Sequence, residues 1–132
     1  MTSHIVTLGL GANVGDREMS LLRAIETLKS ALEDIKASKL YETLAVGKAA
    51  YGTYLNAVVE GKCSMSKEAL ESYLKKMEYD FGRDSEARER GDVPLDVDIV
   101  LFDAEIVRPR DFSQSFFRIG YESLHPEICI VI

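Results

Sequence analysis

The 132-residue sequence contains no tryptophan, three prolines, two cysteines and two histidines. His4 and His125 are far apart and have no acid-rich pattern beside them, which argues against a histidine-based catalytic triad or a zinc site. Cys63 and Cys129 are also far apart, and neither has the spacing of a metal-ligand pair. We expect both cysteines to be small core residues in a reducing compartment rather than partners in a disulfide.

Basic side chains are outnumbered, because 16 Lys and Arg stand against 22 Asp and Glu and give a net charge of −6. This balance disfavours nonspecific binding to nucleic acid or to an anionic membrane. No apolar run is long enough for a transmembrane helix, and Met1–Gly11 lacks the basic start and apolar core of a signal peptide. Hydrophobic residues make up 46% of the chain, which is typical of a globular protein. We therefore expect one cytoplasmic domain that spans residues 1–132.

Apolar spacing predicts strands and helices in alternation. The predicted strands are 4–10, 36–43, 54–61 and 95–102; one amphipathic helix follows Arg17, and the other runs from an N-cap at Ser66 to Phe81. The order β-α-β-β-α-β is typical of the ferredoxin-like class of α+β fold. We expect a four-stranded antiparallel sheet with helices packed on one face, and a short C-terminal helical extension.

The segments between these elements differ in composition. Residues 11–16 form a glycine-rich turn that ends in a capping residue for the first helix, and residues 44–53 are expected to form a mobile loop. Residues 84–93 are dense in charge and have no apolar period, so we expect a solvated loop there. Residues 105–107 are expected to pair back on the last strand through a tight turn.

Two carboxylates lie close together on the last predicted strand, in the run Leu95-Asp96-Val97-Asp98. Because side chains alternate along a strand, Asp96 and Asp98 point to the same face, with Cα atoms roughly 6.5 Å apart. Such carboxylates raise each other's pKa unless a cation lies between them, and their hard oxygens suit Mg²⁺. An edge strand with one solvated acidic face would have the same pattern, so the strand alone leaves both interpretations open.

Other polar groups could also bind ligands. Tyr54 and Asn56 share one face of a strand, where an aromatic ring beside an amide suits a planar heterocycle, although Tyr in a strand is commonly a packing residue. Arg83 follows the second helix, and Arg88 and Arg90 lie in the charged segment after it. Arginine recognises phosphate, but the acidic residues interleaved here are equally consistent with a solvated surface.

Taken in order, these features resemble the 6-hydroxymethyl-7,8-dihydropterin pyrophosphokinase family of folate biosynthesis. The resemblance extends from about Ile5 to Phe102, and its motifs are Gly11-Ala12-Asn13-Val14-Gly15-Asp16, Tyr41-Glu42-Thr43, Tyr54-Leu55-Asn56-Ala57, Glu78, Gly82-Arg83 and Leu95-Asp96-Val97-Asp98. Each motif alone is weak, whereas their joint order and spacing are specific. The resemblance implies transfer of pyrophosphate from ATP to the hydroxymethyl group of the pterin, assisted by two Mg²⁺ ions.

The resemblance also implies roles for residues at the nucleotide end of the site. Asp96 and Asp98 match the two aspartates that hold the Mg²⁺ ions, which would stabilise the attacking and leaving oxygens of an in-line displacement. Glu78 and Arg83 match nucleotide-site positions, and Arg83 would also be catalytic.

At the pterin end, Thr43 and Asn56 match positions that recognise the pterin, and Tyr54 matches an aromatic residue that stacks on its ring. Phe116 or Phe117 would be the second aromatic plate of that sandwich.

The sequence departs from the family pattern in ways that bear on activity. Family members usually carry an arginine three residues before the first aspartate, where Val93 stands, and Leu44-Ala45 replaces an expected proline pair. Loss of a charge-stabilising arginine can lower the rate of phosphoryl transfer by orders of magnitude. We hypothesise that Arg88 or Arg90 compensates. Two alternatives therefore stay open: a catalytically impaired homologue that binds pterin or nucleotide, and a ferredoxin-like interaction module without a small ligand.

Overall fold

The computed structural model describes residues 3–46 and 52–127. Its strands are β1 (His4–Ala12), β2 (Glu33–Ala37), β3 (Tyr41–Leu44), β4 (Thr53–Cys63), β5 (Asp96–Phe102) and β6 (Glu105–Ile106). Its helices are α1 (Arg17–Leu28), α2 (Lys67–Asp80), α3 (Ser85–Arg90), α4 (Pro109–Phe112) and α5 (Ser115–Leu124). The strands form one antiparallel sheet in the order β2-β4-β1-β5-β6, and β3 also pairs with β4.

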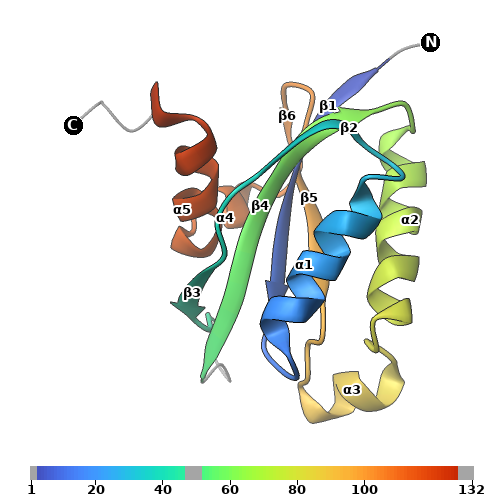
Figure 1. The fold of residues 1–132 in the computed structure, drawn as a ribbon, viewed down its shortest axis with the longest axis vertical. Coiled ribbons are helices and arrows are strands. Elements are labelled where there is room, and N and C mark those ends of the chain that lie inside the picture. The colour runs from blue at the N-terminus through green and yellow to red at the C-terminus, as the bar shows by residue number, and fades with distance from the viewer. Residues whose placement is uncertain (1–2, 47–51, 128–132) are drawn as a thin grey trace.

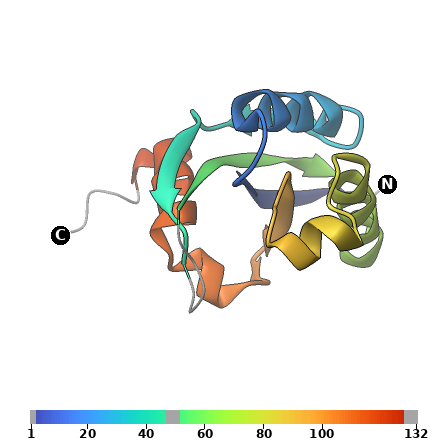
Figure 2. The ribbon, with the colours of Figure 1, turned by 90° about the horizontal axis from the view of Figure 1, so that it is seen from below.

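Helices cover both faces of this sheet (Figures 1 and 2). α1 and α2 pack on one face, where Leu8 and Val97 belong to the main hydrophobic core. α5 packs on the other face, over a smaller cluster of Val58, Val100 and Phe117. Because side chains alternate along a strand, the even-numbered residues of β4, and those of β5 from Asp96 to Val100, face α5. The candidate site residues of these two strands are among them.

Several predictions from the sequence are confirmed. The protein has the α+β class, and β6 pairs back on β5 with Ile106 opposite Leu101. Asp16 caps α1 by accepting a hydrogen bond from Met19 N, and Ser66 caps α2 in the same way. Cys63 is buried and free, whereas Cys129 lies outside the described residues. Within residues 3–46 and 52–127, no helix is long and apolar enough to cross a membrane.

The strand count is a correction, because the described chain forms six strands where the sequence predicts four. The predicted strand 36–43 is divided into β2 and β3 at Ser38. The N–H of Ser38 donates to Val58 O at 2.8 Å, and its Oγ accepts a hydrogen bond from Val58 N at 2.8 Å. A side chain thus takes a hydrogen bond that a continuous strand would make with its backbone, and apolar spacing does not reveal this.

The charged segment 84–93 is a second correction, because it contains α3 rather than only a solvated loop. Asp84 caps the helix by accepting a hydrogen bond from Ala87 N at 2.9 Å, and Gly91 ends it with a φ of 75°. Only Ala87 is buried, so the helix has no apolar stripe that the sequence pattern could detect. The C-terminal extension consists of two helices, α4 and α5. Of the predicted mobile loop, residues 47–51 lie outside the described residues.

Gly120 allows α5 to approach the sheet closely. A Cβ atom at this position would lie 2.6 Å from Val58 Cγ2 and 2.8 Å from Tyr41 Oη. Tyr41 also donates a hydrogen bond to the Phe116 carbonyl oxygen at 2.6 Å, so the same tyrosine fixes the first turn of α5. We predict that Gly120→Ala lowers the free energy of unfolding by about 1–3 kcal/mol, because the added methyl group overpacks this contact.

Chemical denaturation followed by circular dichroism measures the change in stability. Ile119→Ala is the control, because Ile119 is an exposed neighbour on the same helix, and its effect should stay within about 0.5 kcal/mol. In a helix with free space around it, replacing glycine by alanine is stabilising. A more stable Gly120→Ala variant would therefore contradict the close packing of α5.

Candidate active site

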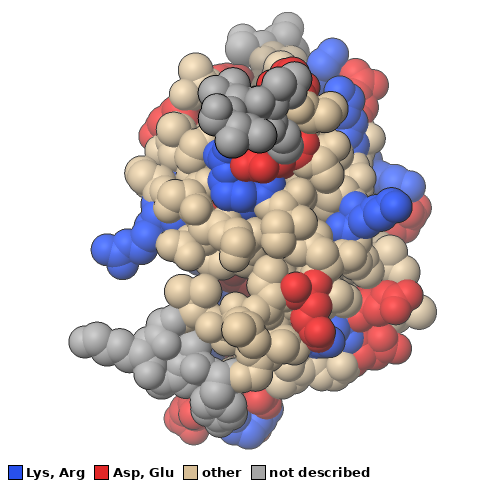
Figure 3. Space-filling model, turned by 90° about the vertical axis from the view of Figure 1, so that its left-hand side faces the viewer, with Lys and Arg blue, Asp and Glu red and all other residues tan. Residues whose placement is uncertain are grey.

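A cavity of about 430 Å³ lies on the α5 side of the sheet. Eight of the ten site residues predicted from the sequence line it: Thr43, Tyr54, Asn56, Arg83, Arg88, Asp96, Asp98 and Phe116. The other two, Glu78 and Arg90, are not part of its wall. Figure 3 shows the face that carries α5 and β3, where the surface is hollowed below the centre of the view and charges of both signs are interspersed.

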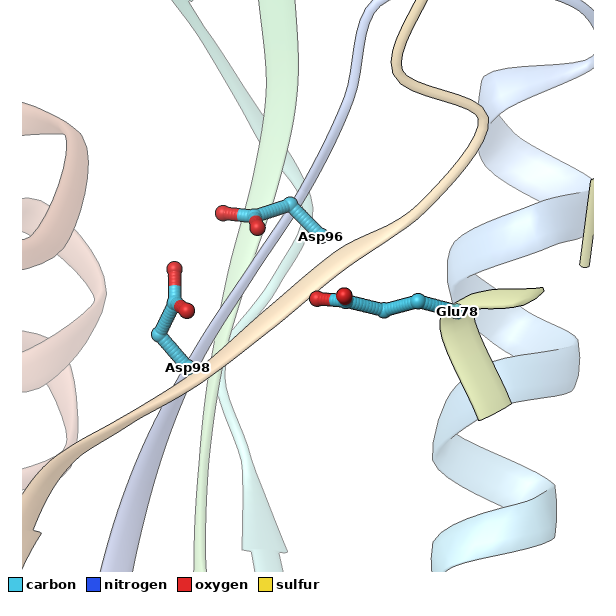
Figure 4. Close-up of side chains that lie close together, drawn as sticks. All are labelled: Glu78, Asp96 and Asp98. Carbon is cyan, nitrogen blue, oxygen red and sulfur yellow. The ribbon is translucent and has the colours of Figure 1, made fainter. Parts of the chain in front are cut away.

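Three carboxylates converge at the edge of β5 (Figure 4). Asp96 and Asp98 project from one side of the strand, Glu78 reaches it from α2, and one oxygen of each lies within 4.8 Å of the others. Glu78 is only 3% exposed, and its Oε2 accepts a hydrogen bond from Val97 N at 2.7 Å. This hydrogen bond to Glu78 connects α2 to the part of β5 that does not pair with β6.

Arg83 supplies positive charge to this cluster. Its Nη1 lies 2.7 Å from Asp96 Oδ1 and 3.4 Å from Glu78 Oε2. Its Nε is buried and has no hydrogen-bond partner among the described residues. A buried donor without a partner carries a desolvation cost, so the described residues do not fully satisfy this guanidinium.

The carboxylates are not fully compensated by the protein itself. Burial, together with the neighbouring Asp96 carboxylate, raises the pKa of Asp98 to about 8. Burial also raises the pKa of Glu78 above its usual range. A cation bound between such carboxylates would favour their ionised forms, and hard oxygen ligands of this kind suit Mg²⁺.

The other end of the cavity combines an amide with aromatic rings. Asn56 is 4% exposed, and its Nδ2 donates hydrogen bonds to Thr43 Oγ1 at 2.8 Å and to Tyr41 O at 3.2 Å. These bonds fix the orientation of the amide group. Tyr54 and Phe116 line the same cavity, and a site of this composition can recognise a flat, polar ring. Phe117 also lines the cavity but is buried within the α5 cluster.

The glycine-rich turn after β1 positions the segment that leads into β5. Asn13 Oδ1 accepts a hydrogen bond from Val93 N at 2.7 Å, and Asn13 N donates to Val93 O at 2.9 Å. Val93, where the sequence resemblance predicts an arginine, lines the cavity. Arg90 is exposed at the end of α3, and its Nε pairs with Asp92 at 2.8 Å.

Residues 7–126 match the family model of 7,8-dihydro-6-hydroxymethylpterin-pyrophosphokinase (HPPK). The chain belongs to the HPPK family. It is 41% identical over 105 residues to the 2-amino-4-hydroxy-6-hydroxymethyldihydropteridine pyrophosphokinase of Aquifex aeolicus (strain VF5), and 36% identical over 105 residues to that of Bacillus subtilis (strain 168). It is also 33% identical over 102 residues to a folate synthesis bifunctional protein of Arabidopsis thaliana.

These alignments cover most of this chain but less of its relatives. They include 80%, 78% and 76% of this chain, and 65%, 62% and 21% of the Aquifex, Bacillus and Arabidopsis proteins. The chain thus spans under two thirds of the length of these relatives.

Sequence reasoning missed two basic residues of this HPPK-family site, Lys75 and Arg108. Both line the cavity, and Arg108 Nη1 lies 3.9 Å from Asp98 Oδ1. Lys75 lies three residues before Glu78 on α2, so helical spacing places the two on neighbouring positions of one helix face. Lys75 could therefore have been predicted from its spacing to Glu78. Arg108 follows β6 in the chain, and only the return of α4 to the sheet brings it to the site.

We predict that Asp98→Asn raises the free energy of unfolding of the metal-free protein near pH 8. The folded-state pKa of about 8 lies above the ordinary value of 3.8, so the folded state keeps a proton that the unfolded state loses. The contribution of Asp98 to the stability of the unchanged protein therefore falls as the pH rises from about 4 to about 8, and then levels off. Asparagine does not titrate, so the advantage of the variant should grow across the same window.

Thermal unfolding in EDTA from about pH 5 to about pH 9 measures this difference. Asp80→Asn is the control, because Asp80 is an exposed carboxylate that pairs with Lys76 on the surface of α2. A stability difference between Asp98→Asn and the unchanged protein that is constant with pH would contradict the raised pKa.

Proposed function

We propose that this protein transfers a pyrophosphoryl group from ATP to the hydroxymethyl group of 6-hydroxymethyl-7,8-dihydropterin. The observation that carries the proposal is a single cavity that holds Asp96 and Asp98 together with the amide and aromatic groups of Asn56, Tyr54 and Phe116. Such a cavity suits metal-bound phosphates and a flat polar ring at once. Membership of the HPPK family and the names of the relatives support the same reaction.

The pterin would bind between Tyr54 and Phe116, which offer aromatic surfaces for its ring. Asn56 would recognise the polar edge of the ring, because its amide is held in one orientation by Thr43. Preorganised polar groups of this kind fix the orientation of a ligand, and here they would direct the hydroxymethyl group toward the carboxylates.

The donor set at the other end of the cavity fits Mg²⁺, since three carboxylates with mutually close oxygens include one whose pKa is raised to about 8. Asp96 and Asp98 would hold two Mg²⁺ ions, and Glu78 would position β5 beside α2 through its bond to Val97 N. When bound, the ions would neutralise charge on the triphosphate and stabilise the transferred group.

In the reaction, the hydroxymethyl oxygen forms a bond to the β-phosphorus of ATP, and the bond from that phosphorus to the oxygen shared with the α-phosphorus breaks. AMP leaves, and the hydroxyl proton passes to solvent. Arg83 would donate to the phosphate oxygens, where a fixed positive charge stabilises the transition state. Arg88 is a further candidate, because it also lines the cavity.

We also propose that residues 1–132 form one domain and that the protein acts in the cytoplasm. The core of this domain would be a ferredoxin-like arrangement that is extended by further strands. The strand order β5-β1-β4-β2 within the sheet supports the ferredoxin-like description.

Incubation with ATP, Mg²⁺ and 6-hydroxymethyl-7,8-dihydropterin tests the proposal, with AMP measured by chromatography and ligand binding by calorimetry. Pterin-dependent formation of AMP is expected. Binding of both ligands without AMP would indicate the catalytically impaired homologue. Absence of both binding and AMP would indicate the interaction module without a small ligand, and either of these results would overturn the proposal.

A further inference from the structure

The cavity is positively charged relative to the whole protein. Among the described residues that line it, four are basic and three are acidic, although the chain as a whole carries a net charge of −6. The basic residues are Lys75, Arg83, Arg88 and Arg108, and the acidic residues are Asp96, Asp98 and Asp111. Cations are thus concentrated in a cavity where the proposed nucleotide would bring several negative phosphate charges.

The arginine predicted at position 93 is absent, and Val93 offers only backbone groups, both bound to Asn13. Arg83 already uses its Nη1 for Asp96 and Glu78, so it does not supply the missing charge alone. Beyond Arg83 and Arg88, further positive charge at the nucleotide end of the site would therefore come from elsewhere in the chain.

Arg108 is well placed to supply it. It precedes α4, and the backbone there is attached to β5 because Val107 N donates to Val100 O at 2.8 Å. Arg108 Nε pairs with Asp111 Oδ2 at 2.6 Å, which leaves the Nη groups on the side of Asp98. The side chain is 48% exposed, so it can reorient toward an anion without first leaving a buried site.

Lys75 approaches the same position from α2. A second cavity of about 100 Å³ adjoins the first, and the residues common to the two walls are Lys75, Asp98 and Arg108. Lys75 forms no ion pair with any residue that the structure describes, whereas its neighbour Lys76 pairs with Asp80 on the surface. The ammonium of Lys75 is therefore free to bind a ligand near Asp98.

We propose that Arg108 and Lys75 bind the phosphate groups of the nucleotide beside Asp98, in place of the arginine missing at Val93. This inference rests on the proposed use of ATP and names residues for it that the sequence motifs do not contain. A bidentate guanidinium and a compact ammonium are the two side-chain groups best suited to phosphate. On nucleotide binding, Arg108 would exchange part of its contact with Asp111 for phosphate oxygens.

Isothermal titration calorimetry with ATP and Mg²⁺, without pterin, tests the inference. Arg108→Ala and Lys75→Ala should each weaken ATP binding about ten- to a hundredfold, the range expected for loss of one charged hydrogen bond. Arg108→Lys should restore part of the affinity, because it keeps the positive charge but not the planar fork, and Lys76→Ala should bind ATP as the unchanged protein does.

Asp111→Asn separates phosphate binding from a structural role of the Arg108–Asp111 pair. If Arg108 binds phosphate, this variant should bind ATP with equal or higher affinity, because it releases the guanidinium and removes a negative charge. If Arg108 only holds α4 in place, Asp111→Asn should weaken binding as Arg108→Ala does, and the inference is wrong. Unchanged affinity in Arg108→Ala and Lys75→Ala would overturn this inference alone, whereas no ATP binding by the unchanged protein would overturn the proposed function as well.

Discussion

Asp96→Asn is expected to lower the rate of pterin-dependent AMP formation by on the order of 10³-fold. Asp96 is the carboxylate that Arg83 contacts at 2.7 Å, and it lies with Asp98 and Glu78 in the one cluster of described residues that could hold a metal ion. Asparagine keeps the shape of the side chain but loses the negative charge that binds Mg²⁺. The lower rate should therefore be accompanied by weaker binding of ATP and Mg²⁺, whereas binding of the pterin should be unchanged.

Steady-state kinetics and calorimetry with ATP and Mg²⁺ measure this effect. Asp80→Asn is again the matched control, because it removes an exposed carboxylate that is not part of the cavity wall and should leave the rate unchanged. Circular dichroism verifies that the variants fold. If Asp96→Asn binds ATP and Mg²⁺ with the affinity of the unchanged protein, the assignment of Asp96 to the metal is wrong.

Arg83→Ala is expected to have a comparable effect on turnover and a measurable effect on folding. The guanidinium contacts Asp96 and lies 3.4 Å from the buried Glu78, so its removal leaves acidic groups without their counter-charge. We expect the rate of AMP formation to fall by about 10²- to 10³-fold, and the free energy of unfolding at neutral pH to fall by about 2 kcal/mol.

Two comparisons separate these contributions. Arg83→Lys keeps a positive charge but not the planar fork, so it should recover part of the stability and less of the turnover. Arg23→Ala is the control. Arg23 belongs to α1 and lies over the Phe81 ring, outside the cavity wall, so its removal should not change the rate. Full turnover in Arg83→Ala would show that Arg83 does not act on the transferred group.

The part of the site that lies within single strands could be predicted from the sequence. Alternation along a strand places Asp96 and Asp98 on one face, and it does the same for Tyr54 and Asn56. Antiparallel pairing of β1 with both β4 and β5 then brings these faces together, which the predicted order of strands and helices already implies. For these residues, local spacing and topology are sufficient.

The part of the site that depends on contacts between distant segments could not be predicted. Ser38 divides a predicted strand by hydrogen bonding to Val58, and α3 is held by caps without an apolar stripe. Arg108 reaches Asp98 only because the chain after β6 returns along the open part of β5. Arg90, which the sequence groups with Arg88, points away toward Asp92. In each case polar contacts decide the geometry, and hydrophobic periodicity does not reveal such contacts.

Mass spectrometry of the pterin product tests the proposed function most directly. After incubation with ATP and Mg²⁺, the proposal predicts that the pterin gains a diphosphate group and that AMP forms in equal amount. The Asp96→Asn variant should produce neither compound above the level of a reaction without protein. A pterin monophosphate formed together with ADP, or an unmodified pterin in the presence of folded protein, would contradict the proposed transfer.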